Sequence, residues 1–123
     1  MATKEAIPGI GAIVLGTAQT GNVDTANTLD RGTYRGPMAV VLTNVDAGGG
    51  TVKVDIKGSV DGTNFYNAAY ALVATPETVS IAQITVTAAV TTTYLLRPDH
   101  AWQFVKLAYS SNTAETLTAT AYL

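Results

Sequence analysis

Residues 38–57 read MAVVLTNVDAGGGTVKVDIK, and they carry the strongest structural signal in the chain. The first half, Met38 to Val45, is an almost unbroken apolar run that suits a strand buried on both faces. In the second half, apolar residues at 52, 54 and 56 alternate with charged residues at 53, 55 and 57, which is typical of a strand with one face in water. The glycines at 48–50 between them suit a turn. The stretch therefore predicts two β-strands paired as a hairpin.

The rest of the chain repeats this strand signal and contains no apolar periodicity of helical type. In the last segment, Leu117, Ala119, Ala121 and Leu123 would lie on one face and the intervening threonines and Tyr122 on the other. The further expected strands are residues 65–71, 78–90, 94–96, 102–109 and 116–123. Short strands at this spacing predict an all-β chain: a single antiparallel β-sandwich or jelly roll of about seven or eight strands.

The first third of the chain gives a weaker signal. Residues 9–16 are compatible with one strand, but residues 17–36 are polar and glycine-rich, with little to bury. We therefore expect residues 1–36 to form an extended N-terminal arm and long loop, and residues 37–123 to form the sandwich core of one domain. We also expect the threonine-rich last strand to be an exposed edge to which another subunit adds.

The composition narrows the classes of function. Charged residues make up 13% of the chain and hydrophobic residues 47%, and the charged share is about half of that in an average soluble domain. Such a surface suits packing against other subunits. The net charge is −2, and the seven lysines and arginines are scattered, which argues against a nucleic-acid partner. The longest apolar run near the start, residues 12–15, is far too short to cross a membrane, and the first residues do not read as a secretory signal.

Candidate catalytic and metal-binding groups are few. The one histidine, His100, follows Asp99, and adjacent side chains on an extended backbone point apart, so the pair reads as a turn. Without cysteine and with one histidine, the usual zinc ligand sets are excluded. Asp46, Asp55 and Asp61 are too widely spaced for a calcium loop. We therefore expect no enzyme activity, no cofactor, no metal site and no small-molecule substrate.

Two groups of residues carry a family resemblance. The turn Gly58-Ser59-Val60-Asp61-Gly62-Thr63-Asn64-Phe65 resembles an S-x-D-G-x-x-[WF] turn of small β-sandwich proteins in tailed-phage virions. The ending, residues 102–107 followed by a polar turn and residues 117–123, is also similar to theirs, so the resemblance covers residues 38–123. It implies a capsid decoration or cement protein: a homodimer or homotrimer, made in the host cytoplasm, that binds the major capsid protein in the virion. It carries over no active-site residues.

The expected partner contacts come from the predicted arm, the Asp-Gly turn and the outer face of the last strand. They are Arg31, Tyr34, Arg35, Phe65, Tyr66, Thr116, Thr118, Thr120 and Tyr122. Two other functions stay open at this point: a tail, neck or fibre component, and a module that binds carbohydrate or a host surface. The carbohydrate module requires exposed aromatic rings, and Phe65, Tyr66 and Trp102 are the candidates.

Overall fold

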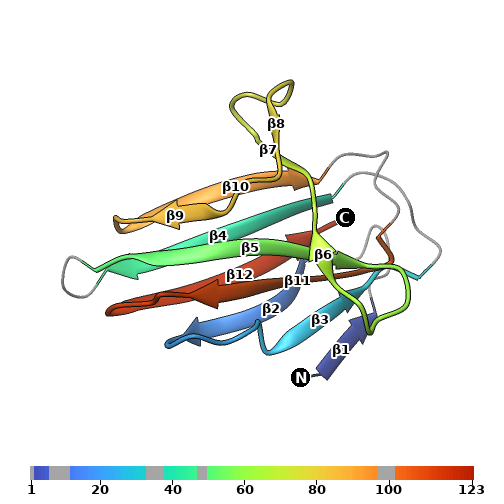
Figure 1. Ribbon diagram of the computed structural model, residues 1–123, viewed down its shortest axis with the longest axis horizontal. Coiled ribbons are helices and arrows are strands. Elements are labelled where there is room, and N and C mark those ends of the chain that lie inside the picture. The colour runs from blue at the N-terminus through green and yellow to red at the C-terminus, as the bar shows by residue number, and fades with distance from the viewer. Residues whose placement is uncertain (1, 6–11, 33–37, 47–49, 97–101) are drawn as a thin grey trace.

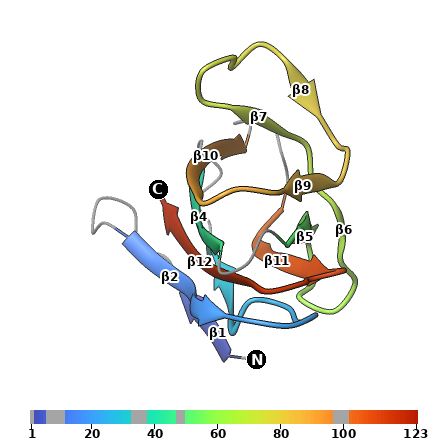
Figure 2. The same ribbon diagram turned by 90° about the vertical axis from the view of Figure 1, so that its left-hand side faces the viewer.

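The computed structural model describes residues 2–5, 12–32, 38–46, 50–96 and 102–123. Within these residues the chain forms twelve strands and no helix. The strands make two six-stranded sheets that stack face to face, which the end-on view shows clearly (Figure 2). The predicted all-β sandwich is confirmed. Six of the strands are seven or more residues long and the other six are short, so the chain has more elements than the seven or eight predicted.

The first sheet, here sheet A, has the order β1-β3-β11-β5-β6, and β9 also pairs with β5. Its strands pair antiparallel except for β1 and β3, which are parallel. The bounds are β1 Ala2–Glu5, β3 Asn27–Asp30, β5 Val52–Ser59, β6 Tyr66–Asn67, β9 Ile84–Val86 and β11 Phe104–Ser110.

The second sheet, sheet B, has the order β2-β12-β4-β10-β7-β8 and is antiparallel throughout. The bounds are β2 Ala12–Gln19, β4 Met38–Asp46, β7 Tyr70–Leu72, β8 Val79–Ser80, β10 Val90–Leu96 and β12 Glu115–Tyr122. The short strands β7 and β8 form a hairpin that stands out from the body of the sandwich (Figures 1 and 2).

The predicted hairpin of residues 38–57 is wrong. β4 lies in sheet B between β12 and β10, whereas β5 lies in sheet A beside β11, β6 and β9. The chain therefore crosses from one sheet to the other between Asp46 and Val52, a step of about 10 Å between packed sheets. β4 is also not buried on both faces, because Val41 is only half-buried and the side chain of Val45 is 58% exposed.

The segment predicted as an arm lies within the sandwich where the structure describes it. β2 pairs with β12 and β3 pairs with β11, so both run beside strands from the C-terminal part of the chain (Figure 1). Leu15 and Leu29 are fully buried in the core, and Thr25 accepts a hydrogen bond from the Leu107 amide through Oγ1. The polar sequence concealed this because the two core leucines are widely spaced. Residues 1, 6–11 and 33–36 of the predicted arm lie outside the described residues.

The last strand is not an edge. β12 lies between β2 and β4 and pairs with both, so its backbone groups are engaged on each side. The predicted division of its faces is confirmed, since Leu117, Ala119 and Ala121 are buried and the alternate residues are not. β11 alternates in the same way, with Val105, Leu107 and Tyr109 buried.

The core fills the space between the two sheets. It is built from aliphatic side chains on the facing surfaces of the long strands, and Trp102 packs against it at one end. Its largest members include Leu15, Leu29, Met38, Leu42, Ile56, Tyr94, Leu96, Leu107, Tyr109 and Leu117. Because these side chains point inward, the alternate residues of each strand form the two outer faces of the sandwich.

Candidate functional site

The outer face of sheet B is uncharged over its whole described extent. Cross-strand pairing places Thr120 of β12 between Val14 of β2 and Val41 of β4, and Val41 pairs in turn with Thr93 of β10. Directly paired residues share a face, so the register defines the surface, here called the neutral face. Its members are Ala12, Val14, Ala39, Val41, Thr43, Val45, Thr91, Thr93, Leu95, Thr116, Thr118, Thr120 and Tyr122.

Three threonines of the neutral face make side-chain hydrogen bonds at this surface. The hydroxyls of Thr43 and Thr91 lie 3.1 Å apart across neighbouring strands. Thr118 Oγ1 accepts a hydrogen bond of 2.9 Å from the Ala18 amide, which ties β2 to the same surface. The other members of the face are aliphatic side chains, further threonines and Tyr122. An uncharged surface of this kind costs little to desolvate, which is the property of the central part of a protein interface.

Sheet A presents the opposite character to solvent. Lys53, Asp55 and Lys57 alternate along its strand β5, and Lys106 lies beside Lys57 on β11. The Lys106 Nζ forms an ion pair of 2.8 Å with Asp24 Oδ2 and lies 4.2 Å from the ring centroid of Phe65. We call this surface the charged face. The contrast between the two outer faces marks the neutral face as the one suited to burial against a partner.

The Asp-Gly turn that carries the family resemblance has a structural role. Asp61 Oδ1 accepts hydrogen bonds of 2.9 Å from the amides of Thr63 and Asn64 and from the Ser59 hydroxyl. These bonds hold the pKa of the Asp61 carboxyl well below its usual range. Gly62 adopts a positive φ of 78°, which an L side chain rarely adopts. The motif therefore shapes the turn between β5 and β6.

The predicted contact residues divide between several places. Thr116, Thr118, Thr120 and Tyr122 lie together on the neutral face. Arg31 does not reach a surface, since it is 1% exposed and its Nε donates a 2.8 Å hydrogen bond to the Trp102 carbonyl.

Phe65 lies against Lys106 on the charged side. Tyr66 is 58% exposed and belongs to β6, the strand at the end of sheet A. Tyr34 and Arg35 lie outside the described residues, as do Asp99 and His100. Among the predicted contacts that the structure describes, the β12 residues are therefore the ones on the neutral face.

Sequence reasoning missed the β4, β10 and β2 parts of the neutral face. The missing residues are Ala12, Val14, Ala39, Val41, Thr43, Val45, Thr91, Thr93 and Leu95. A signal for them was available: β4 up to Val45 and β10 contain no charged residue at either set of alternating positions. A strand with a solvent face normally carries charges there.

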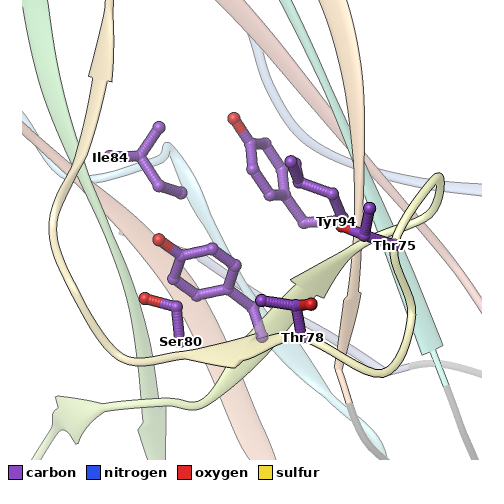
Figure 3. Close-up of a pocket in the computed structure, with 7 residues that line it drawn as sticks. Thr75, Thr78, Ser80, Ile84 and Tyr94 are labelled. Carbon is purple, nitrogen blue, oxygen red and sulfur yellow. The ribbon is translucent and has the colours of Figure 1, made fainter.

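A pocket of about 290 Å³ lies beside the β7–β8 hairpin (Figure 3). The residues that line it are Tyr70, Leu72, Thr75, Thr78, Ser80, Ile84 and Tyr94, none of them charged. The rings of Tyr70 and Tyr94 meet edge to face with centroids 5.6 Å apart. The Tyr70 hydroxyl donates a 2.7 Å hydrogen bond to the Ala82 carbonyl, and burial raises the pKa of Tyr94. The pocket is thus a neutral, mainly apolar site.

A second aromatic feature lies where β6 meets Trp102. The rings of Tyr66 and Trp102 stack with centroids 6.2 Å apart and planes 23° apart. Trp102 in turn lies against Gly58, where an added Cβ would approach its Cγ to 2.2 Å. Tyr66 therefore presents an exposed ring supported from behind.

The described residues offer no cluster of three or more histidine, cysteine, aspartate or glutamate side chains that could hold a metal ion. None of the elements in the described part of the chain is a helix long and apolar enough to cross a membrane.

The fold and this surface define a two-sheet, mainly antiparallel β-sandwich with one uncharged outer face. No family model matches the chain, and no curated protein matches it. Among solved structures it is similar to the crystal structure of SPBc2 prophage-derived protein YomS, with a TM-score of 0.68. The match covers 95% of this chain and 97% of that chain at 8% sequence identity. At this identity the likeness shows a shared fold over nearly the whole length of both proteins.

Proposed function

We propose that this protein is a non-enzymatic structural protein of a phage virion, and specifically a decoration or cement protein that binds and stabilises the major capsid protein lattice. The observation that carries the proposal is the neutral face of sheet B. A solvent-facing sheet surface without charge is unusual in a chain whose other sheet carries Lys53, Asp55, Lys57 and Lys106 outward. Burial against another protein accounts for the difference.

The mechanism is adhesive. The neutral face buries its valine, threonine and alanine methyl groups against the shell, which releases water from apolar surface. The hydroxyls of Thr43 and Thr91 are engaged with each other and that of Thr118 with the Ala18 amide, so these three polar groups keep a protein partner on docking. Many copies on one shell then stabilise it through repeated weak contacts.

Two further observations support a phage origin. One solved structure that shares the fold is that of a prophage-derived protein, and the shared fold extends over almost all of both chains. The turn of residues 58–65 and the ending of residues 102–123 resemble small sandwich proteins of tailed-phage virions, and both lie on described, ordered parts of the sandwich. These observations support the class of protein, and the neutral face supports its mode of action.

The test is a pair of matched charge substitutions. Thr120→Lys places an ammonium group in the middle of the neutral face, and Thr85→Lys places one on β9 opposite Lys53, on the charged side. Binding is measured by co-sedimentation with undecorated phage shells. We expect Thr120→Lys to weaken binding by about tenfold or more, because an interface would bury the charge unpaired, and Thr85→Lys to bind normally.

Equal binding by the intact protein and Thr120→Lys would contradict the proposal. If the intact protein binds isolated tails and leaves shells unbound, the same face serves a tail, neck or fibre component.

A carbohydrate or host-surface module is the second candidate, and the stacked pair Tyr66 and Trp102 favours it. Tyr66 is 58% exposed, and an exposed ring with a rigid support is the kind of platform on which sugars stack. Glycan-array binding that is lost in Tyr66→Ala and kept in Thr120→Lys would favour this function over the structural one.

A further inference from the structure

The β7–β8 hairpin is an apolar projection. Its exposed side chains include Leu72, Val73, Val79 and Ile81, with exposed fractions of 42%, 54%, 49% and 60%. Between residues 68 and 96 the one charged residue is Glu77. The hairpin extends beyond the sandwich in both views (Figures 1 and 2). Exposing four aliphatic side chains to water on one projection is unfavourable, and such a patch is typical of a contact surface.

The pocket lies on the same hairpin and is suited to one such side chain. Ser80, Thr78 and Thr75 of the hairpin line it together with Tyr94 of β10 and Ile84 of β9 (Figure 3). Its volume of about 290 Å³ exceeds the 150 Å³ or so of an apolar cavity that holds benzene. An aliphatic side chain from outside fits within it. The uncharged lining gives no partner to a charged group.

We propose that two copies of this chain associate through their hairpins, with Ile81 of each copy inserted into the pocket of the other. Ile81 follows directly after Ser80, a lining residue, so the inserting side chain and the receiving pocket lie beside each other. A twofold axis at this point makes both insertions in one closed interface.

The charge and the sheet edge also fit a second copy. Self-association brings together two hairpins with one Glu77 each and no other charge, so little repulsion opposes it. β8 ends sheet B and, in the described part of the chain, pairs only with β7, which leaves its outer edge open to a copy of itself. Ile81 and the residues that line the pocket are not among the members of the neutral face, so substitutions at these positions leave that face unchanged.

Light scattering on a sizing column over a range of protein concentrations tests the proposal. We expect the intact chain to have a dimer mass that dissociates on dilution. Ile81→Glu should weaken the dimer by about tenfold or more because the carboxylate would enter an uncharged pocket. Val60→Glu is the matched control, since Val60 has the same exposed fraction of 60% at the distant Asp-Gly turn.

A monomeric intact chain at every concentration overturns the proposal. So does an Ile81→Glu variant that stays dimeric, or equal dissociation of both variants. Circular dichroism of each variant confirms that the sandwich is folded.

Cross-linking gives a second, independent measurement. The chain contains no cysteine, so an introduced pair reports contact between two molecules directly. A tagged Ile81→Cys chain mixed with an untagged Thr75→Cys chain should form a mixed disulfide, because Thr75 lines the pocket. A tagged Val60→Cys chain mixed with Thr75→Cys should not. Absence of the mixed disulfide in the first pair overturns the insertion.

Discussion

Asn44 and Glu115 form a polar pair in the core of the sandwich. Both are almost fully buried, and Asn44 Nδ2 donates to Glu115 Oε2 and to the Ala88 carbonyl, the latter at 2.9 Å. Asn44 Oδ1 and Glu115 Oε1 have no hydrogen-bond partner among the described residues. Asn44→Ala removes the donor to the buried carboxyl and should lower the free energy of unfolding by about 2 to 4 kcal/mol.

Urea denaturation of the two single variants and the double variant checks this expectation. Asn44→Ala with Glu115→Ala should lose less than the sum of the single losses, because each single variant leaves one polar group unpaired. Additive losses would show that the two side chains do not depend on each other.

The buried Tyr109 should make the stability of the fold decrease at high pH. Its side chain is 3% exposed, its hydroxyl has no hydrogen-bond partner within the described residues, and burial raises its pKa above the usual 10.0. The fold therefore favours the protonated phenol. That contribution to stability is complete below about pH 10 and is lost as the pH rises further.

Tyr109→Phe cannot ionise, so urea unfolding of this variant should lose less stability between about pH 8 and about pH 11 than the intact chain. Removing an unpaired buried hydroxyl should change stability near neutral pH by less than about 1 kcal/mol. The control is Tyr66→Phe, whose side chain is 58% exposed in the intact protein. The same pH dependence in Tyr109→Phe and the intact chain would contradict the expectation.

At the level of the elements, β5 needs a glycine where Trp102 crosses it. An added Cβ at Gly58 would approach the Trp102 Cγ to 2.2 Å, and Gly58 is not among the described glycines with positive φ, so the conflict is steric. Gly58→Ala should displace the ring from Gly58 and from Tyr66 and lower the free energy of unfolding by about 1 to 3 kcal/mol.

Trp102 is the one tryptophan of the chain, so its fluorescence emission should shift to longer wavelength in Gly58→Ala. Gly21→Ala is the control: Gly21 has a φ of 80° but open space around it, so it adds backbone strain without touching Trp102. An unchanged emission spectrum in Gly58→Ala would contradict this account.

The long strands were largely predictable, and their partners were not. The single strands predicted at residues 65–71 and 78–90 are wrong, because each range contains two short strands that belong to different sheets: β6 and β7 in the first, β8 and β9 in the second. Alternation along β11 and β12 gives the buried face of each correctly, because the side-chain period of a strand is a local property. The same pattern cannot tell whether β4 continues into a hairpin or crosses to the other sheet. The β12 part of the neutral face could therefore be predicted, whereas its extension over β4, β10 and β2 depends on pairings between residues far apart in the sequence.

On the scale of the whole molecule, the two ends of the chain complete each sheet together. β2 pairs with β12 in sheet B, and β3 pairs with β11 in sheet A. β2 therefore protects the hydrogen-bonding edge of β12, which would otherwise be open to another chain. Without β2, β12 would be the exposed edge strand that the sequence predicts.

Removing residues 1–19 should restore that edge. The truncated chain loses the fully buried Leu15 and leaves the β12 backbone unpaired on one side. We expect it to form oligomers or aggregates on a sizing column, because an open, threonine-rich edge recruits other strands. Leu15→Ala in the full chain separates the effect of lost packing from that of the exposed edge. It should lower the free energy of unfolding by about 2 to 5 kcal/mol, while β2 stays paired with β12. Both chains carry Ile81→Glu, so that hairpin association does not contribute. A truncated chain with the same mass as Leu15→Ala would mean that β2 serves the core alone and that the edge of β12 needs no cover.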